Sequence, residues 1–146
     1  MNQPFWIQKS LDQMSPIEWE SICDGCGKCC LNKLENIETR EVFNTNVACY
    51  LLDDTSCQCS DYENRLARVS RCFKLTPQNI SGQDWLPRTC AYRLLSEGKS
   101  LPSWHHLVSG SSEAIHSSGM SVRGKIISEH RVHEEDMEDF IVKWVN

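Results

Sequence analysis

The sequence predicts an α+β fold: a small single domain over residues 1–146 with short helices, a β-hairpin and a cysteine-rich centre. Three observations support this prediction. A chain of 146 residues has the usual length of one domain and can bury an apolar core. Short stretches of helical and of strand-like pattern alternate along it. Its 9 cysteines, far more than ordinary usage, all lie between residues 23 and 90.

Two helix starts precede the first cysteine. Pro4 suits the first turn of a helix, with Asn2 or Gln3 as its cap, and apolar residues then recur at helical spacing at Ile7, Leu11 and Met14. Ser15-Pro16-Ile17-Glu18 has the pattern of a capping box, with proline at the first helical position. We therefore expect a second, short helix that leads into the first cysteine.

A β-hairpin is predicted after the first cysteines. Residues 31–35 and 41–47 have strand-like composition, and residues 36–40 would connect them and return the chain to Cys49. From Cys49 to Cys72 the chain has little apolar periodicity, so burial alone would order it poorly. We expect metal ligation to supply the missing free energy there.

Four further elements are expected in the C-terminal half. Thr76-Pro77 begins a brief helix, and Thr89 can cap another over residues 90–97, with Gly98 just beyond its end. Residues 101–119 have the composition of a loop, and residues 121–129 that of a strand. The clearest helix is predicted last, behind an acidic first turn, with an apolar face of Met137, Phe140, Ile141, Trp144 and Val145.

The strongest functional signal is the run Cys23-Asp24-Gly25-Cys26-Gly27-Lys28-Cys29-Cys30. Two residues between cysteines let the chain turn back so that two thiolates reach one metal ion. Gly25 and Gly27 can take the positive φ that such a turn needs. Adjacent cysteines seldom ligate one ion together, so Cys29 and Cys30 could serve two sites, or one of them could be structural. We interpret the run as a metal or iron–sulfur site rather than as disulfides or inert thiols.

Several other residues have both a functional and a simpler explanation. The five histidines, His105, His106, His116, His130 and His133, could ligate metal, but nine thiols already exceed the need, so surface solvation is the favoured explanation. Asp53 and Tyr62 could form hydrogen bonds to ligands or belong to an ordinary turn. Arg65, Arg68 and Arg71 could neutralise thiolate charge, bind an anionic partner or simply be solvated. The sequence has no phosphate loop, no Rossmann glycine pattern and no nucleophile elbow.

Charge and composition restrict the partners and the compartment. The net charge of -5 and the pI of about 5.5 argue against general nucleic-acid binding, because a phosphate backbone attracts proteins with an excess of basic residues. The N-terminus lacks the features of a secretory signal peptide, and no apolar run approaches the roughly 20 residues of a membrane span. We therefore expect a cytoplasmic protein with no membrane partner, in a compartment where disulfides are disfavoured.

The order and spacing of the cysteines resemble the CxxCxxCC family, whose members are described as zinc- or iron-chelating proteins. The resemblance extends over Cys23-x-x-Cys26-x-x-Cys29-Cys30, Cys49-x-x-Leu52-Asp53, Cys59-x-x-Tyr62-x-x-Arg65 and Cys72. Residues 85–95 and 104–110 are similar to its YcgN-like (UPF0260) branch. The resemblance implies a metal or iron–sulfur site formed by Cys23, Cys26, Cys29, Cys30, Cys49, Cys59, Cys72 and Cys90. Cys57 has no counterpart in the family pattern and is the alternative to Cys59.

These observations favour a metal-binding protein that chelates zinc or iron through its cysteine cluster, rather than an enzyme. Two alternatives remain open. The cysteines could hold an iron–sulfur cluster with an electron-transfer role or a redox- or metal-sensing role. They could instead belong to a metal-dependent enzyme, which would need one coordination position left free for water or substrate.

Overall fold

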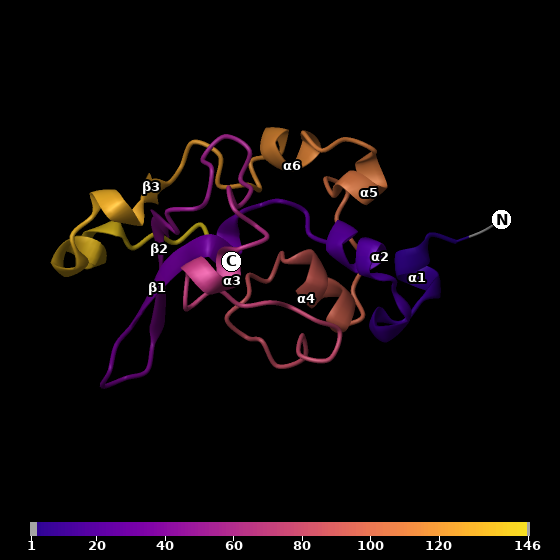
Figure 1. Ribbon diagram of the computed structural model, residues 1–146, viewed down its shortest axis with the longest axis horizontal. Helices are drawn as coiled ribbons and strands as arrows, with labels where there is room; N and C mark the ends of the chain where they lie inside the picture. The colour runs from indigo at the N-terminus through magenta and orange to yellow at the C-terminus, as the bar shows by residue number, and fades with distance from the viewer. Residues whose placement is uncertain (1–2, 146) are drawn as a thin grey trace. The chain divides into compact units, whose positions relative to one another are not determined.

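The computed structural model describes residues 3–145, which fold into two compact units. The helical unit comprises Met1–Asp24 and Lys74–Ser118, and the cysteine unit comprises Gly25–Phe73 and Gly119–Asn146. Each unit therefore combines two separate segments of the chain. Helices make up the first unit and a three-stranded sheet is the centre of the second, which confirms the α+β class (Figure 1). The extent of the domain, residues 1–146, stays a prediction.

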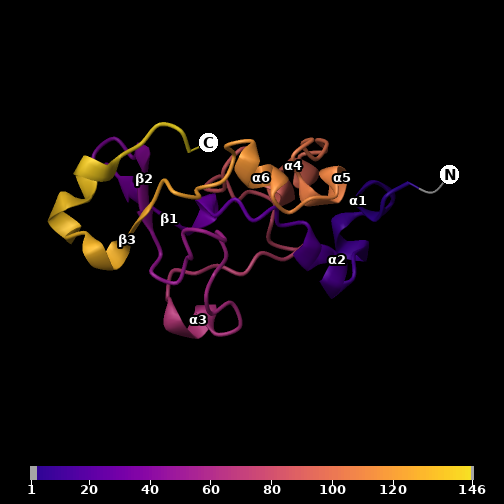
Figure 2. The same cartoon turned by 90° about the horizontal axis from the view of Figure 1, so that it is seen from above.

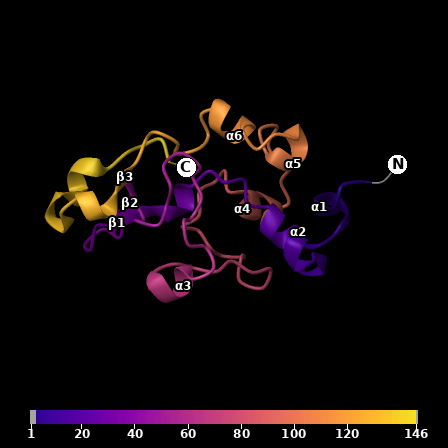
Figure 3. The ribbon, with the colours of Figure 1, turned by 45° about the horizontal axis from the view of Figure 1, so that its top comes forward.

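Short helices form the described part of the helical unit: α1 (Phe5–Gln8), η1 (Leu11–Gln13), α2 (Pro16–Ser21), α4 (Ala91–Ser96), α5 (His106–Ser109) and α6 (Ala114–Ser117). The capping box predicted for α2 is present. The Glu18 N–H donates to Ser15 Oγ at 3.1 Å, and the Ser15 N–H donates to Glu18 Oε1 at 2.9 Å. Figure 3 shows α1 and α2 close together near the N-terminus.

Aromatic residues hold the two segments of the helical unit together. The Trp19 ring packs against Tyr92 with centroids 4.5 Å apart, and the Tyr92 hydroxyl donates to the Trp19 carbonyl oxygen at 2.8 Å. Trp19 Nε1 donates to the Leu75 carbonyl oxygen at 3.0 Å. Both aromatic rings belong to a buried cluster of Met14, Trp19, Ile22, Ile80, Leu86, Ala91, Tyr92 and Leu101. The C-terminal end of α2, which leads to Cys23, is thus fixed by the core.

The apolar repeat near the N-terminus does not form the single helix that we expected. The chain leaves the helical conformation after α1, and the Ser10 N–H donates to Gln13 Oε1 at 2.9 Å at the start of η1. A local side-chain bond therefore starts a new turn in place of a continuous helix. Asn2, one of the two expected caps, lies outside the described residues.

Two elements further along the chain also differ from the expectation. Thr76-Pro77 begins only a turn, in which the Asn79 N–H donates to Thr76 Oγ1 at 3.2 Å. The helix expected after Thr89 is present as α4, but Cys90 occupies its N-cap position. Gly98 follows α4 with φ of 75°, as the sequence predicted.

Residues 101–119 contain two helices rather than loop alone. His105 provides the N-cap of α5, because its Nδ1 accepts the Leu107 N–H at 3.0 Å. Gly110 then ends α5 in the left-handed conformation, with φ of 76°. The sequence analysis missed α5 because a histidine side chain is an unusual N-cap.

The predicted β-hairpin is present in the cysteine unit. β1 (Leu31–Glu35) and β2 (Val42–Ala48) pair in antiparallel register, from Leu31 opposite Ala48 to Glu35 opposite Val42. β3 (Ile127–Ser128) pairs with β2 in parallel, so the strand order is β1-β2-β3. Of the strand expected over residues 121–129, only β3 pairs, because Gly124 takes a positive φ of 73° in a turn before it.

The C-terminal helix that we expected is replaced by other structure. η4 (Glu134–Phe140) is a 3₁₀ helix, and Ile141, which follows it, has an extended backbone. Ile141 forms a β-bridge with Thr45, and the Val142 N–H donates to the Asn44 carbonyl oxygen at 2.8 Å. Pairing with β2 satisfies backbone groups that a longer helix would have satisfied internally. The final described residue, Val145, is buried in an apolar cluster with Leu31, Ala48, Cys57 and Val122.

Three further short helices complete the cysteine unit: η2 (Lys28–Cys30), α3 (Arg65–Arg68) and η3 (Glu129–Arg131). In Figure 2 and Figure 3, α3 stands apart from the three strands of its unit. No helix within residues 3–145 combines the length and the apolar character needed to cross a membrane.

Candidate metal centre

The loop that carries the first cysteines turns sharply at its two glycines. Gly25 has φ of 77° and Gly27 has φ of 79°, so both take the left-handed conformation that the sequence predicted. At Gly27 a side chain would also lack space, because an added Cβ would lie 2.7 Å from Val122 Cγ2. The Lys28 N–H points at Cys26 Sγ, 3.5 Å away. A backbone N–H donated to sulfur favours the thiolate form that a metal ion requires.

Backbone hydrogen bonds attach this loop to the rest of the cysteine unit. The Val122 N–H donates to the Cys26 carbonyl oxygen at 2.9 Å, and the Cys49 N–H donates to that of Cys30, also at 2.9 Å. The second bond places Cys49 beside the end of the loop. Cys29 is exposed whereas Cys30 is partly buried, so the adjacent thiols differ in environment.

The turn after Cys49 brings Cys59 back to the same region. Leu52 and Cys59 form an antiparallel bridge, and the Asp53 carboxylate accepts the N–H groups of Thr55 and Ser56 at 2.9 and 2.8 Å. These bonds lower the pKa of Asp53, which thus serves the turn. Burial raises the pKa of the Cys49 thiol, and the negative charges of Glu129 and Cys59 act in the same direction. Cys49 and Cys59 therefore share one electrostatic environment.

Cys57 occupies a different environment from Cys59. Its side chain is buried in the apolar cluster of the cysteine unit, and its backbone has φ of 60°. Burial raises the pKa of the Cys57 thiol, although hydrogen bonding with Ser121 opposes the shift. Packing in the core is sufficient to explain Cys57, and the choice of Cys59 rather than Cys57 as a ligand stays a prediction.

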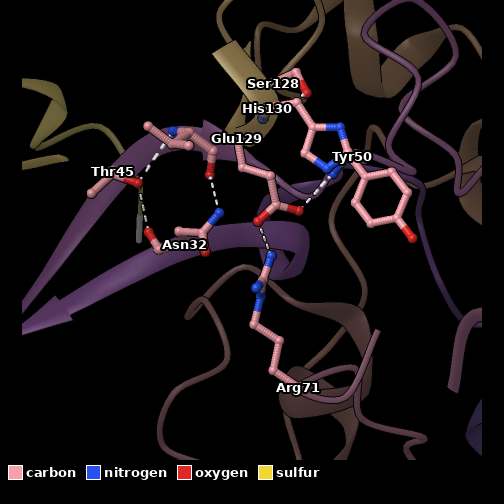
Figure 4. A network of polar contacts seen from close by, with 8 residues as sticks. Asn32, Thr45, Tyr50, Arg71, Ser128, Glu129 and His130 are labelled. Atoms are coloured by element: carbon pink, nitrogen blue, oxygen red, sulfur yellow. Dashed lines mark hydrogen bonds and ion pairs between the residues drawn. The ribbon is translucent and has the colours of Figure 1, made fainter. Parts of the chain in front are cut away.

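Cys72 follows α3, and the residue before it, Arg71, belongs to a polar network around Glu129 (Figure 4). The Cys72 N–H donates to the Val69 carbonyl oxygen at 3.1 Å. The preceding residue, Arg71, forms an ion pair with the Glu129 carboxylate. The same carboxylate accepts the N–H of Tyr50, the residue after Cys49, at 2.8 Å. Sequence analysis did not identify Glu129, because no motif marks a carboxylate whose partners lie far away in the chain.

Cys23 and Cys90 belong to the helical unit. Cys23 is exposed and directly follows Ile22, whose carbonyl oxygen lies 2.7 Å from His105 Nε2. Cys90 is the N-cap residue of α4 and packs against the buried apolar cluster of this unit.

Charged residues within the cysteine run are buried, which sequence reasoning did not foresee. Lys28 is 3% exposed and Asp24 is 9% exposed. Near the same run, burial lowers the pKa of Lys33, although the Cys29 and Cys30 thiolates act in the opposite direction. A cation beside thiolates can offset their negative charge. Lys28 and Asp24 lie between closely spaced cysteines, and this position was the signal in the sequence that could have indicated their burial.

Several of the remaining candidates, including His105, His130 and Arg65, have structural partners. Both ring nitrogens of His105 are occupied, and the His130 ring stacks on Tyr50 with centroids 4.4 Å apart. The Arg65 guanidinium lies 3.7 Å from the centroid of the exposed Tyr62 ring.

No disulfide joins any of the nine cysteines, and within residues 3–145 no three His, Cys, Asp or Glu side chains are grouped closely enough to hold a metal ion. The structure brings the Cys30, Cys49 and Cys59 segments together in the cysteine unit and links Cys72 to Cys49 through Glu129. Convergence of all eight candidate ligands stays a prediction.

Comparison with known proteins adds independent information. A family model, CxxCxxCC, described as "Putative zinc- or iron-chelating domain", matches residues 22–91. A UPF0260 protein of Pseudomonas putida is 54% identical over 141 residues, which cover 97% of this chain and 95% of the relative. One of Mesorhizobium japonicum is 56% identical over 144 residues, which cover 97% of each chain. No solved structure matches the chain.

Proposed function

The chain belongs to the UPF0260 family, and from this premise we propose that it is a metal-binding protein. In this proposal it chelates zinc or iron through the thiolates of Cys23, Cys26, Cys29, Cys30, Cys49, Cys59, Cys72 and Cys90. The family model over residues 22–91 covers all of these cysteines.

The observation that carries the proposal is the conformation of the cysteine loop. Both glycines take positive φ, and the Lys28 N–H approaches Cys26 Sγ, which is the arrangement that a C-x-x-C turn needs to present sulfur to a metal ion. Cys49 is hydrogen-bonded to the end of this loop through the carbonyl oxygen of Cys30, and Cys59 pairs with Leu52 in the turn after Cys49. Binding would require the thiols to lose their protons and their side chains to move together, so it would be coupled to ordering of the unit.

The donor set fits soft metal chemistry. Thiolates favour zinc, iron and iron–sulfur clusters over magnesium and calcium, which prefer oxygen ligands. Bound zinc would stabilise the fold without redox chemistry.

An iron–sulfur protein with an electron-transfer or sensing role is the second candidate. Exposure of Cys23 and Cys29 favours it, because solvent exposure is one of the properties that set the reduction potential of a cluster.

The high number of cysteines also supports a place in the cytoplasm, where disulfides are disfavoured and clustered thiols are more often ligands. In this proposal the metal ion or cluster is the main partner. The net charge of -5 makes general nucleic-acid binding unfavourable.

Metal analysis of anaerobically purified protein, together with an absorption spectrum, tests the proposal. Zinc in a colourless sample would support the first candidate, and iron with acid-labile sulfide in a brown sample would support the second. Protein that contains neither metal, and that takes up neither zinc nor iron after reduction, would contradict both.

A further inference from the structure

The Glu129 carboxylate connects three separate parts of the cysteine unit (Figure 4). Its Oε2 accepts the Tyr50 N–H at 2.8 Å, and its Oε1 pairs with the Arg71 guanidinium. Burial alone would raise the pKa of Glu129, but the hydrogen bonds from Tyr50 and Arg71 outweigh it and lower the pKa. The carboxylate is therefore ionised and fully engaged at neutral pH.

Both donors are immediate neighbours of candidate ligands. Tyr50 follows Cys49, and Arg71 precedes Cys72. One carboxylate thus holds the backbone beside Cys49 and the side chain beside Cys72. The His130 ring, adjacent to Glu129 in the chain, stacks on Tyr50 at an interplanar angle of 12° and reinforces the same connection.

The network differs from an ordinary surface ion pair. The Glu129 side chain is 17% exposed and that of its partner Arg71 is 56% exposed, whereas in the Glu35–Arg40 pair of the β-hairpin the two side chains are 48% and 79% exposed. Glu129 also accepts a backbone N–H, which fixes the chain itself and not only a flexible side chain. Carboxylates that orient ligand segments in this way affect metal affinity without touching the metal.

We propose that Glu129 and Arg71 are positioning residues that align Cys49 and Cys72 in the metal centre. This inference rests on the proposed function, because it requires Cys49 and Cys72 to be ligands. Neither Glu129 nor Arg71 is proposed to bind the metal.

Glu129→Gln tests the inference, because it preserves size and an oxygen acceptor but removes the charge that pairs with Arg71. We expect its affinity for zinc, measured by competition with a chromophoric chelator, to fall about 10- to 100-fold. Glu35→Gln is the matched control, since it makes the same chemical change in another ion pair of the same unit. Its zinc affinity should equal that of the wild type. Equal affinity of Glu129→Gln and the wild type would overturn the inference.

A double-mutant cycle separates positioning from general destabilisation. If Glu129 acts through Cys49, then Glu129→Gln should weaken zinc binding strongly in the wild type and little in a Cys49→Ser background. If the fold-losses in zinc affinity of the two single variants multiply in the double variant, the inference is overturned. Bound Co²⁺ provides a second readout, because the intensity of thiolate-to-cobalt absorption at saturation reports the number of bound sulfurs. We expect that intensity to fall in Glu129→Gln and to stay unchanged in Glu35→Gln.

Arg71→Lys provides a variant that keeps the positive charge, in case Glu129→Gln does not fold. We expect Arg71→Lys to lower the zinc affinity of the wild type but not that of a Cys72→Ser variant. A loss of affinity of equal size in both backgrounds would contradict the inference. Failure of the proposed function is distinguishable, because the wild type itself would then bind neither zinc nor Co²⁺.

Discussion

The helical unit buries Trp19 and Tyr92 together with six smaller apolar residues, whereas the buried cluster of the cysteine unit consists of Leu31, Ala48, Cys57, Val122 and Val145. Large aromatic side chains remove more apolar surface from water than valine or alanine, so burial contributes more stability to the helical unit. The cysteine unit compensates with polar connections such as those of Glu129. The comparison indicates that the unit with seven of the nine cysteines depends more on an additional source of stability.

Among the changes considered, removal of metal should have the largest effect on the difference in stability between the two units. We expect a chelator to increase hydrogen exchange throughout the cysteine unit, while the backbone around Trp19 and Tyr92 stays protected, because only the cysteine unit would lose a large part of its stability. Ile141 and Val142 should lose protection too, since they pair with β2. Hydrogen exchange with and without chelator measures this. Equal protection in both states would show that metal is not needed for the fold.

Removal of single thiols should distinguish ligands from core residues. Cys26→Ser is expected to lose most of the bound metal, because the loop would retain neighbouring thiolates without a full set of ligands. Cys57→Ser should keep its metal and lose only stability, since Cys57 is buried in the apolar cluster. Metal content per chain and thermal unfolding, measured side by side, give both results. If Cys57→Ser lost as much metal as Cys26→Ser, Cys57 would replace Cys59 in the ligand set.

The two glycines of the loop should differ in their tolerance of a side chain. At Gly25 an added Cβ meets no atom within 4 Å, so Gly25→Ala should cost about 1–2 kcal/mol through its left-handed backbone alone. At Gly27 the same backbone cost is joined by a clash with Val122, which should add about 1–3 kcal/mol. Chemical denaturation of both variants compares the free energies of unfolding. Equal losses would mean that the loop can move away from Val122.

Acid should lower the stability of the helical unit through His105, and this is the smallest of the expected effects. Burial lowers the pKa of His105 and His106 adds to the shift, while the hydrogen bond with Ile22 and the charge of Asp24 oppose it. The unfolded chain therefore binds a proton more readily than the folded chain, so stability is complete above a pH of about 6.5 and falls as the pH decreases below it.

His105→Gln should remove this dependence, because an amide can still donate to the Ile22 carbonyl oxygen but does not titrate. Thermal unfolding between neutral and mildly acidic pH tests it. The same slope in wild type and variant would assign the pH dependence to another group.

Several features followed from the sequence because their causes lie within a few residues of each other. The capping box of Ser15 and Glu18 is complete over one helical turn, and the hairpin follows from two strand-like stretches joined by a short connection. The positive φ angles of Gly25 and Gly27 follow from the spacing of the cysteines beside them. The α+β class and the family resemblance depend on such local patterns and were both confirmed.

Other features were decided only by tertiary structure. The apolar repeat from Met137 to Val145 is helical in pattern, yet the chain pairs with β2 instead, since backbone hydrogen bonds to Asn44 and Thr45 became available. The role of Glu129 depends on Tyr50 and Arg71, which are distant in the chain, and the burial of Lys28 depends on the packing of its loop. Periodicity and motif spacing describe preferences of nearby residues, whereas these contacts form only after the chain has folded back on itself.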